Sequence, residues 1–305
     1  MRTVWINAVL MFGLMLPAAA AESAGEREEQ NFLFLLEEAY TQHRNELQLT
    51  PAVHFTKRKG TEAEIDEDGN SVKAAKTATQ VRWPIEAEWG LTDRLEAQVG
   101  LSWIYEATDS TPVATENRDT KHNEDFEDME LGLRYKLVEQ LEQWPTISLG
   151  YTLALPTGDH KEEFGAVHAG HEWVLLVSRD FGRWVGHLNA GFGIHFNETQ
   201  PNEDGTKSPK VDLREFSYGA AAVYRLTDHW KGFLEFFHQF GEEIQANTRK
   251  AETALTILPG ISYAAAMPGG GNNDYWELGL GVPVGLTSDA LDWGLILRLR
   301  YEVQF

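Results

Sequence analysis

The sequence predicts an all-β protein, a closed antiparallel transmembrane β-barrel of about 12 strands. Apolar and polar residues alternate with a period of two along most of the chain. Short and long polar connections also alternate between these segments, as in outer-membrane barrels. A barrel strand needs an apolar residue only at every second position, so the mean hydropathy of −0.37 is compatible with a membrane protein.

Residues 1–21 are expected to be a secretory signal peptide. Arg2 precedes an apolar core, and the small residues Ala18, Ala19 and Ala20 fit a cleavage after Ala20 or Ala21. The chain has no cysteine, so an exported fold cannot depend on disulfides and must rely on packing or on closure of its sheet.

Residues 22–45 are expected to form a periplasmic segment before the barrel. The apolar residues at helical spacing are Phe32, Leu33, Leu35, Leu36 and Tyr40. Because this spacing gives one apolar face, we predict a short amphipathic helix within residues 25–45. This helix either plugs the lumen or caps its periplasmic mouth, and a loosely packed segment is the alternative.

The barrel is expected over residues 46–305. In chain order, the predicted strands fall within residues 47–55, 80–91, 94–106, 129–137, 147–155, 173–177, 188–196, 216–224, 234–236, 255–263, 276–284 and 295–305. In the last of these, Leu295, Leu297 and Leu299 oppose Arg298 and Arg300. An even number of strands returns both ends of the barrel to the periplasmic side.

The connections between these strands differ in length. Turns such as "LTDRLE", "RDFGRW" and "RLTDHW" are short, which is typical of the periplasmic side. The predicted extracellular loops are long and polar, and span residues 57–78, 107–127, 156–171, 197–213 and 241–252. Two connections fit less well, because "MPGGGNND" is long for a periplasmic turn and "GLTSDALDW" is short for an outer loop.

A soluble β-sandwich also alternates apolar and polar residues, with the apolar side chains inward. The polar face here carries many Arg, Lys and Glu residues, among them Lys136, Lys231 and Glu235, which suits a wet lumen. Aromatic residues near the ends of the apolar face resemble the girdles of membrane proteins. These residues are Trp83, Trp89, Trp103, Tyr105, Trp173, Trp276 and Trp293. We therefore favour the membrane barrel, in which closure satisfies every backbone group within lipid.

Three stretches resemble a known family: "FLFLLEEAYTQ" leading into "ELQLTP", "LGLRYKL" followed by "PTISLGYTLALPTGD", and "YWELGLGVPVGL" with "LRLRYEVQF". The most distinctive motif is "LPTGD", Leu155 to Asp159. The family is that of outer-membrane proteins associated with the meta-pathway of phenol degradation. This resemblance implies a barrel in the outer membrane of a Gram-negative bacterium that passes small, hydrophobic or aromatic solutes.

Charged residues on the inward face are the candidates for lumen and selectivity roles. They include Arg82, Glu86, Glu88, Arg94, Glu96, Glu130, Arg134, Arg225, Arg298, Arg300 and Glu302. In a narrow barrel, opposite charges pair across the lumen. The alternative is a charge ring that selects ions in a water-filled pore. The mixture of signs favours a partly filled lumen with a narrow path.

The turn that "LPTGD" forms at the end of its strand offers candidates for a loop constriction. They are Pro156, Thr157, Gly158, Asp159 and His160. If this loop folds inward, its polar groups would narrow the lumen. Ordinary turn chemistry at the barrel rim is the preferred interpretation.

Catalysis, metal binding and cofactor binding are not expected. No serine stands in a G-x-S-x-G motif, and His168 with His171 and Glu172 is the best remaining constellation for a base or a metal. "DEDGN" lacks the full calcium-loop pattern, so solvated loops explain the acidic stretches. The formal net charge of −21 argues against a nucleic-acid partner.

The sequence therefore predicts an outer-membrane channel that passes small solutes by passive diffusion. Alternatives are a barrel enzyme acting on lipids and a structural or adhesive barrel with functional acidic loops. Expected partners are the solute, outer-membrane lipids, lipopolysaccharide and the barrel-assembly machinery. Tyr301, Val303 and Phe305 resemble the carboxy-terminal signal that this machinery recognises.

Overall fold

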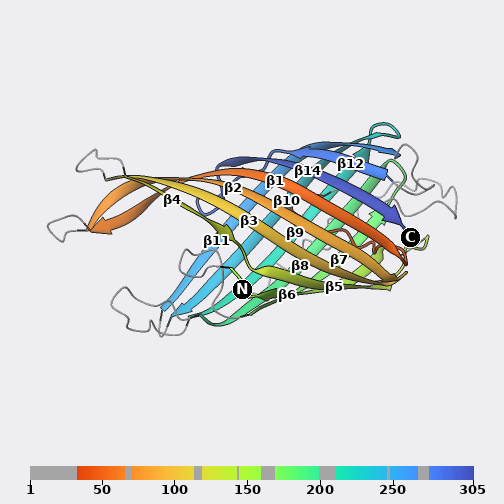
Figure 1. The fold of residues 1–305 in the computed structure, drawn as a ribbon, viewed down its shortest axis with the longest axis horizontal. Helices are drawn as coiled ribbons and strands as arrows, with labels where there is room; N and C mark the ends of the chain where they lie inside the picture. Colours follow the sequence, from red (N-terminus) through yellow and green to blue (C-terminus); the bar gives the residue numbers. More distant parts are fainter. Residues whose placement is uncertain are drawn as a thin grey trace, which may run out of the picture.

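The computed structural model describes residues 33–65, 71–112, 119–142, 144–158, 169–198, 211–245, 248–266 and 275–305. Strands dominate this part of the chain, and none of it is helical (Figure 1). No helix in these ranges is long and apolar enough to cross a membrane. The strands are β1 (Glu46–Ile65), β2 (Ser71–Thr92), β3 (Leu95–Pro112), β4 (Asp119–Phe126), β5 (Met129–Val138), β6 (Thr146–Leu155), β7 (Gly170–Asp180), β8 (Trp184–Glu198), β9 (Val211–Arg225), β10 (Trp230–Gln245), β11 (Thr248–Ala266), β12 (Tyr275–Gly281), β13 (Val284–Gly285) and β14 (Trp293–Gln304).

These elements form one closed antiparallel barrel in the order β1-β2-β3-β5-β6-β7-β8-β9-β10-β11-β12-β14, and β14 pairs with β1 to close the ring. β4 and β5 pair with successive parts of β3 and act as one interrupted strand. β12 and β13 likewise pair with successive parts of β11. The barrel therefore has 12 strands, and every predicted strand is confirmed.

Three of the predicted long loops are wrong in length, because strands occupy much of them. β1 and β2 pair as far as Ile65 and Ser71, within the expected loop at 57–78. β3 and β4 continue through 107–127, and β10 and β11 through 241–252. Beyond the membrane, both faces of a hairpin contact water. Apolar and polar residues therefore no longer alternate in the sequence, although the strands continue. We call the end of the barrel with these extended hairpins the loop end. The opposite end, which has the short connections 93–94, 181–183 and 226–229, is called the turn end.

The two faces of the barrel have opposite character. Apolar side chains such as Ile85, Leu133 and Leu297 are exposed on the outside. Glu96, Glu235 and other polar side chains of the inner face are buried. A soluble sandwich would show the reverse arrangement, so the apolar outer face is a lipid-facing belt.

Aromatic residues border this belt at both ends. At the turn end the rings of Trp230 and Trp276 lie 5.0 and 5.6 Å from that of Tyr263. Toward the loop end, the rings of Trp173 and Phe192 from adjacent strands lie 6.1 Å apart. Such girdles mark the two membrane–water interfaces of transmembrane barrels, so the belt between them spans the membrane.

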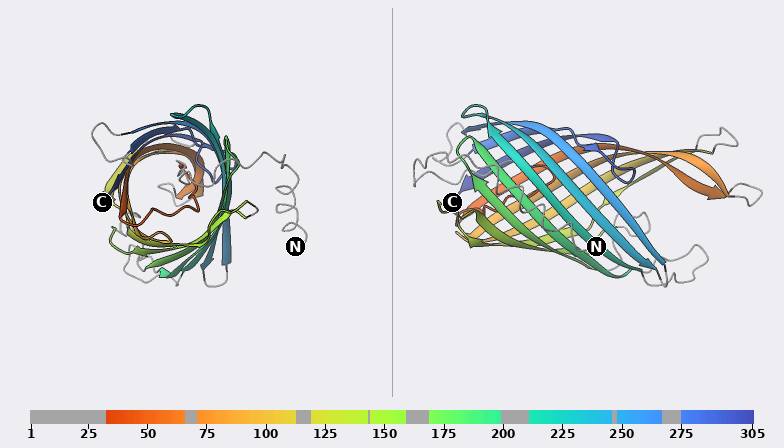
Figure 2. Two further views of the ribbon diagram at one scale, coloured as in Figure 1. Left: turned by 90° about the vertical axis from the view of Figure 1, so that its right-hand side faces the viewer. Right: turned by 180° about the vertical axis from the view of Figure 1, so that it is seen from behind.

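Residues 33–45, here called the inner segment, enter the barrel before β1 and lie inside the ring of strands (Figure 2, left). Bends and one turn make up this segment, so the predicted helix is wrong for residues 33–45. Its backbone turns sharply into β1 at Asn45, where φ is 62°. The expected signal peptide and the first part of the N-terminal segment, up to residue 32, lie outside the described residues.

Candidate functional site

The inner segment is attached to β10 by one carboxyl group. Glu235 Oε1 accepts a hydrogen bond of 2.7 Å from the backbone N–H of Phe34. Its Oε2 accepts bonds of 2.8 and 3.0 Å from the N–H groups of Leu35 and Leu36. A buried segment without secondary structure needs such partners for its backbone donors, and Glu235 supplies three.

A second attachment joins the inner segment to β6 and β7. The N–H of Ala39 donates to Ser178 Oγ at 2.8 Å, and Ser148 Oγ donates to the carbonyl of Ala39. Ser178 Oγ lies 2.8 Å from Nδ1 of the buried His187 on β8. Short hydroxyl side chains allow the backbone of the inner segment to approach the wall closely at this point.

Arg134 on β5 forms the centre of a buried ionic network. Its guanidinium lies 3.1 Å from Glu96 on β3 and 2.7 Å from Glu37 of the inner segment. Glu96 Oε2 also accepts a 2.7 Å hydrogen bond from the N–H of Gln42. The network therefore joins two wall strands to the inner segment, which it holds at Glu37 and at Gln42.

Two arginines of β14 complete the attachment. Arg298 donates to the carbonyl of Leu33 and lies 2.9 Å from Glu86 on β2. Arg300 lies 3.3 Å from Glu38 of the inner segment. The predicted lumen charges thus pair with the inner segment as well as with each other.

Glycines in the wall make room for the inner segment. A Cβ atom on Gly90 would lie 1.9 Å from the carbonyl oxygen of His43. A Cβ atom on Gly219 would lie 2.4 Å from a methyl group of Leu36. Gly90 must therefore be glycine while the segment occupies its place, because the colliding atom is backbone, whereas a side chain at Gly219 would have to displace the end of the Leu36 side chain.

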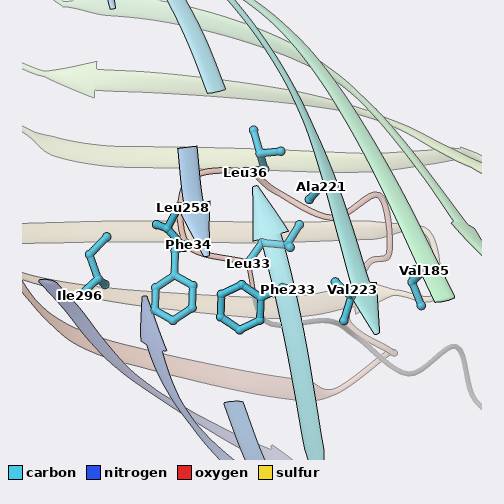
Figure 3. Close-up of a cluster of buried hydrophobic side chains, with 9 residues drawn as sticks. All are labelled: Leu33, Phe34, Leu36, Val185, Ala221, Val223, Phe233, Leu258 and Ile296. Atoms are coloured by element: carbon cyan, nitrogen blue, oxygen red, sulfur yellow. The ribbon is translucent and has the colours of Figure 1, made fainter. Parts of the chain in front are cut away.

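An apolar cluster inside the otherwise polar lumen covers the start of the inner segment (Figure 3). The ring of Phe34 stacks on that of Phe233 from β10, with centroids 5.0 Å apart and planes at 29°. The cluster consists of Leu33, Phe34, Leu36, Val185, Ala221, Val223, Phe233, Leu258 and Ile296. Burial of these side chains stabilises the segment in its place by the hydrophobic effect.

A cavity of about 240 Å³ lies between the inner segment and the wall formed by β1, β2, β3, β5, β6 and β14. Its lining includes Leu33, Phe34, Glu86, Glu130 and Arg134. Carboxylates and guanidinium groups stand beside apolar side chains, so the cavity offers hydrogen-bond donors, acceptors and an apolar surface together.

Most of the predicted lumen residues lie on inward-facing strand positions. These are Arg82, Glu86, Glu88, Glu96, Glu130, Arg134, Arg298, Arg300 and Glu302. Arg94 is a correction, because it lies in the exposed turn between β2 and β3 and not on a strand. Arg225 lies at the turn-end rim, 2.7 Å from Asp180.

The residues considered for a loop constriction make contacts at the rim of the barrel. Thr157 Oγ1 accepts a 2.8 Å bond from the N–H of Met129. The N–H of Gly158 donates to Asp128 at 2.9 Å. Pro156 precedes them directly after β6, while Asp159 and His160 lie outside the described residues.

His171 does not face the lumen. Its Nδ1 lies 2.8 Å from the hydroxyl of Tyr151, and its ring lies 6.1 Å from that of Trp173, which belongs to the outward aromatic girdle. His168, its predicted companion, lies outside the described residues. Within the described part of the chain, no cluster of three or more His, Cys, Asp or Glu residues is arranged to hold a metal ion.

Several contacts of this site were not predicted from the sequence. Glu235 was recognised only as an inward charge, and the roles of Ser148, Ser178 and His187 were missed. Polar side chains at inward positions are common in barrels, so they do not reveal a partner by themselves. The inward Gly90 and Gly219 were a usable signal, because glycine in a strand often marks a close backbone approach.

Comparison with known proteins identifies both fold and family. The COG4313 outer membrane channel from Pseudomonas putida F1 matches with a TM-score of 0.59 and 13% identity, over 88% of this chain and 98% of that one. The transport unit of the autotransporter AIDA-I from Escherichia coli has a TM-score of 0.47 and 10% identity, over 98% and 96%. The NanC porin has a TM-score of 0.44 and 10% identity, over 84% and 100%.

At 13% identity, the likeness to the COG4313 channel shows a shared fold, and no curated protein matches the sequence. The family described as "Putative MetA-pathway of phenol degradation" matches residues 52–266, which is most of the barrel. With its lipid-facing belt and its aromatic girdles, the chain is thus an outer-membrane β-barrel that belongs to this phenol-degradation family.

Proposed function

We propose that this protein is a channel through which small, uncharged aromatic solutes cross the outer membrane of a Gram-negative bacterium by passive diffusion. The observation that carries the proposal is the cavity of about 240 Å³ inside the barrel, where apolar side chains of the inner segment meet polar groups of the wall. The link between the family and phenol degradation supports an aromatic solute.

The proposed path runs along the barrel axis from the loop end to the inner segment. Solutes would enter between the extended hairpins and pass Arg82 before they reach the cavity, whose lining includes Glu130 of the wall and Phe34 of the inner segment. Diffusion needs neither a cofactor nor a catalytic residue, so we infer that the protein is not an enzyme. The inner segment fills the lumen at the turn end. It must therefore move before a solute can leave the cavity toward the periplasm.

We assign the selectivity of this path to the inward charges that line it. Glu86, Glu88 and Glu130 face the cavity together with Arg134, Arg298 and Arg300. Rings of charged side chains set the selectivity of many pores. A lining with both signs is expected to favour neutral polar solutes over ions of either charge.

Uptake by vesicles tests this proposal. Purified protein is reconstituted into lipopolysaccharide-containing vesicles, and the rate of phenol entry is measured with that of protein-free vesicles subtracted. A channel is expected to raise the entry rate of phenol and to leave that of a large disaccharide unchanged. Equal phenol entry with and without protein, together with no conductance in planar bilayers, would overturn the proposal.

Lipopolysaccharide and the barrel-assembly machinery are proposed partners. Tyr301 is exposed on the outer face of β14, and Phe305 follows that strand with 80% of its surface exposed. We propose that Tyr301, Val303 and Phe305 are recognised during insertion. Deletion of Phe305 is expected to lower the amount of protein in isolated outer membranes, and an unchanged amount would contradict this role.

A further inference from the structure

Phe34 presents two chemical groups to one strand of the wall. Its ring stacks on Phe233 with centroids 5.0 Å apart, and its N–H donates to Glu235 at 2.7 Å. Both partners face inward from β10, two residues apart. An aromatic ring and a hydrogen-bond donor are thus bound side by side within the lumen.

We propose that Phe233 and Glu235 form the binding site of the transported solute, and that Phe34 occupies this site as an intramolecular substitute. The inference rests on the proposed function, and it defines the solute class as monoaromatic molecules with a hydrogen-bond donor, such as phenols. The ring of the solute takes the place of the Phe34 ring, and its hydroxyl donates to Glu235.

The surroundings of Phe233 support a site for a planar ring. Leu258 and Ile296 belong to the same buried apolar cluster, and Figure 3 shows their side chains near Phe34. Gly260 on the neighbouring strand has no side chain, and a Cβ atom there would lie 2.0 Å from the ring of Phe233. This glycine lets the Phe233 ring lie against the wall and present its face to the lumen.

The acceptor chemistry of Glu235 decides which aromatic solutes fit. Its carboxyl oxygens accept three backbone N–H donors, from Phe34, Leu35 and Leu36. A phenolic hydroxyl supplies a donor of the same kind. An arene carboxylate offers only acceptors, and its placement against Glu235 would leave buried oxygens without donors, which is unfavourable.

The cavity beside the inner segment provides access to this site. Leu33 and Phe34 contribute to its lining, so a solute in the cavity already contacts the residue that it must displace. The Phe34-bound state competes with the solute. The apparent affinity therefore equals the affinity of the open site multiplied by the fraction of molecules in which the site is open. The inner segment therefore sets the solute concentration at which the site fills.

Binding of phenol to the vesicle-embedded protein tests this inference. Equilibrium dialysis compares the wild type with Phe34→Ala, after heat-modifiability on a gel has shown that both barrels are folded. Removal of the competing ring is expected to tighten phenol binding at least about tenfold, because the open fraction increases. Benzoate binding is expected to show no such gain.

Three further variants make the result specific. Leu36→Ala is the matched control, because Leu36 belongs to the same buried segment and packs at Gly219, whereas the ring that stacks on Phe233 is that of Phe34. It is expected to leave phenol affinity within about twofold of the wild type. Adding Phe233→Ala or Phe233→Leu to Phe34→Ala is expected to abolish the gain.

Unchanged affinity in Phe34→Ala, or an equal gain in Leu36→Ala, would overturn the inference. The proposed function fails separately. If the wild type admits phenol but Phe34→Ala shows no gain in binding, the channel stands without this site. If Phe34→Ala binds phenol but no variant admits it into vesicles, the site stands without the channel.

Discussion

The two halves of the lumen use the same residue types in different environments. At the turn end, the side chains of Arg134 and Glu96 are only 5% and 0% exposed and hold the inner segment. Toward the loop end, those of Arg82 and Glu127 form an ion pair at 36% and 24% exposure. An Arg–Glu pair can thus be a structural attachment or a solvated wall contact, and the difference is burial.

This contrast separates a filled half from an accessible half. Removal of one partner from a buried ion pair leaves the other charge buried without compensation for its lost hydration, which strongly destabilises the fold. An exposed pair gains little, because water and salt replace the lost partner. Substitutions in the two halves should therefore differ in effect although they remove similar contacts.

The largest effect is expected for Arg134→Met. It leaves Glu96 buried without its cation and should destabilise the barrel by about 3–5 kcal/mol. Unfolding by urea in lipid vesicles measures the change. The variant should also make residues 33–45 accessible to protease, because Glu37 and the Tyr40 carbonyl lose their contacts with Arg134. A loss below about 1 kcal/mol would show that the turn-end network behaves like a surface pair.

An intermediate effect is expected for Gly90→Ala. The added methyl group would collide with the His43 carbonyl, and overpacking of this kind typically costs about 1–3 kcal/mol. Urea unfolding gives the cost, and hydrogen exchange should show faster exchange at residues 39–45. Gly241→Ala is the control, because that inward position has no atom within 4 Å of the new Cβ. Similar losses in both variants would contradict a steric role for the inner segment.

The smallest effect is expected for Arg82→Met in the accessible half. Its pair with Glu127 is partly exposed, so the loss should be at most about 1 kcal/mol. The same urea titration, repeated at high salt, should show little further change. A loss as large as that of Arg134→Met would remove the distinction between the two halves of the lumen.

The barrel itself could be predicted from the sequence because lipid imposes a strict rule. Every second residue in the membrane must be apolar, so strands such as 129–137 are visible as alternation. The rule ends at the membrane surface, where hairpins such as 57–65 with 71–78 are wet on both faces. These hairpins were therefore predicted as loops.

The inner segment could not be predicted because its structure depends on partners far away in the sequence. The spacing of Leu33, Leu36 and Tyr40 resembles one face of a helix, and nothing local contradicts a helix. In the folded protein, Glu235 binds the N–H groups that a helix would have used, about 200 residues away. The inward position of Glu235 was predictable, but its role was not.

The position of the inner segment also links strands that lie far apart around the ring. It directly precedes β1, and β1 closes the ring by pairing with β14, the last strand. Its contacts include strands on several sides of the ring, among them β5, β7, β10 and β14. The inner segment therefore cross-links distant parts of the ring from within, and it braces a sheet whose strands otherwise bond only to their neighbours.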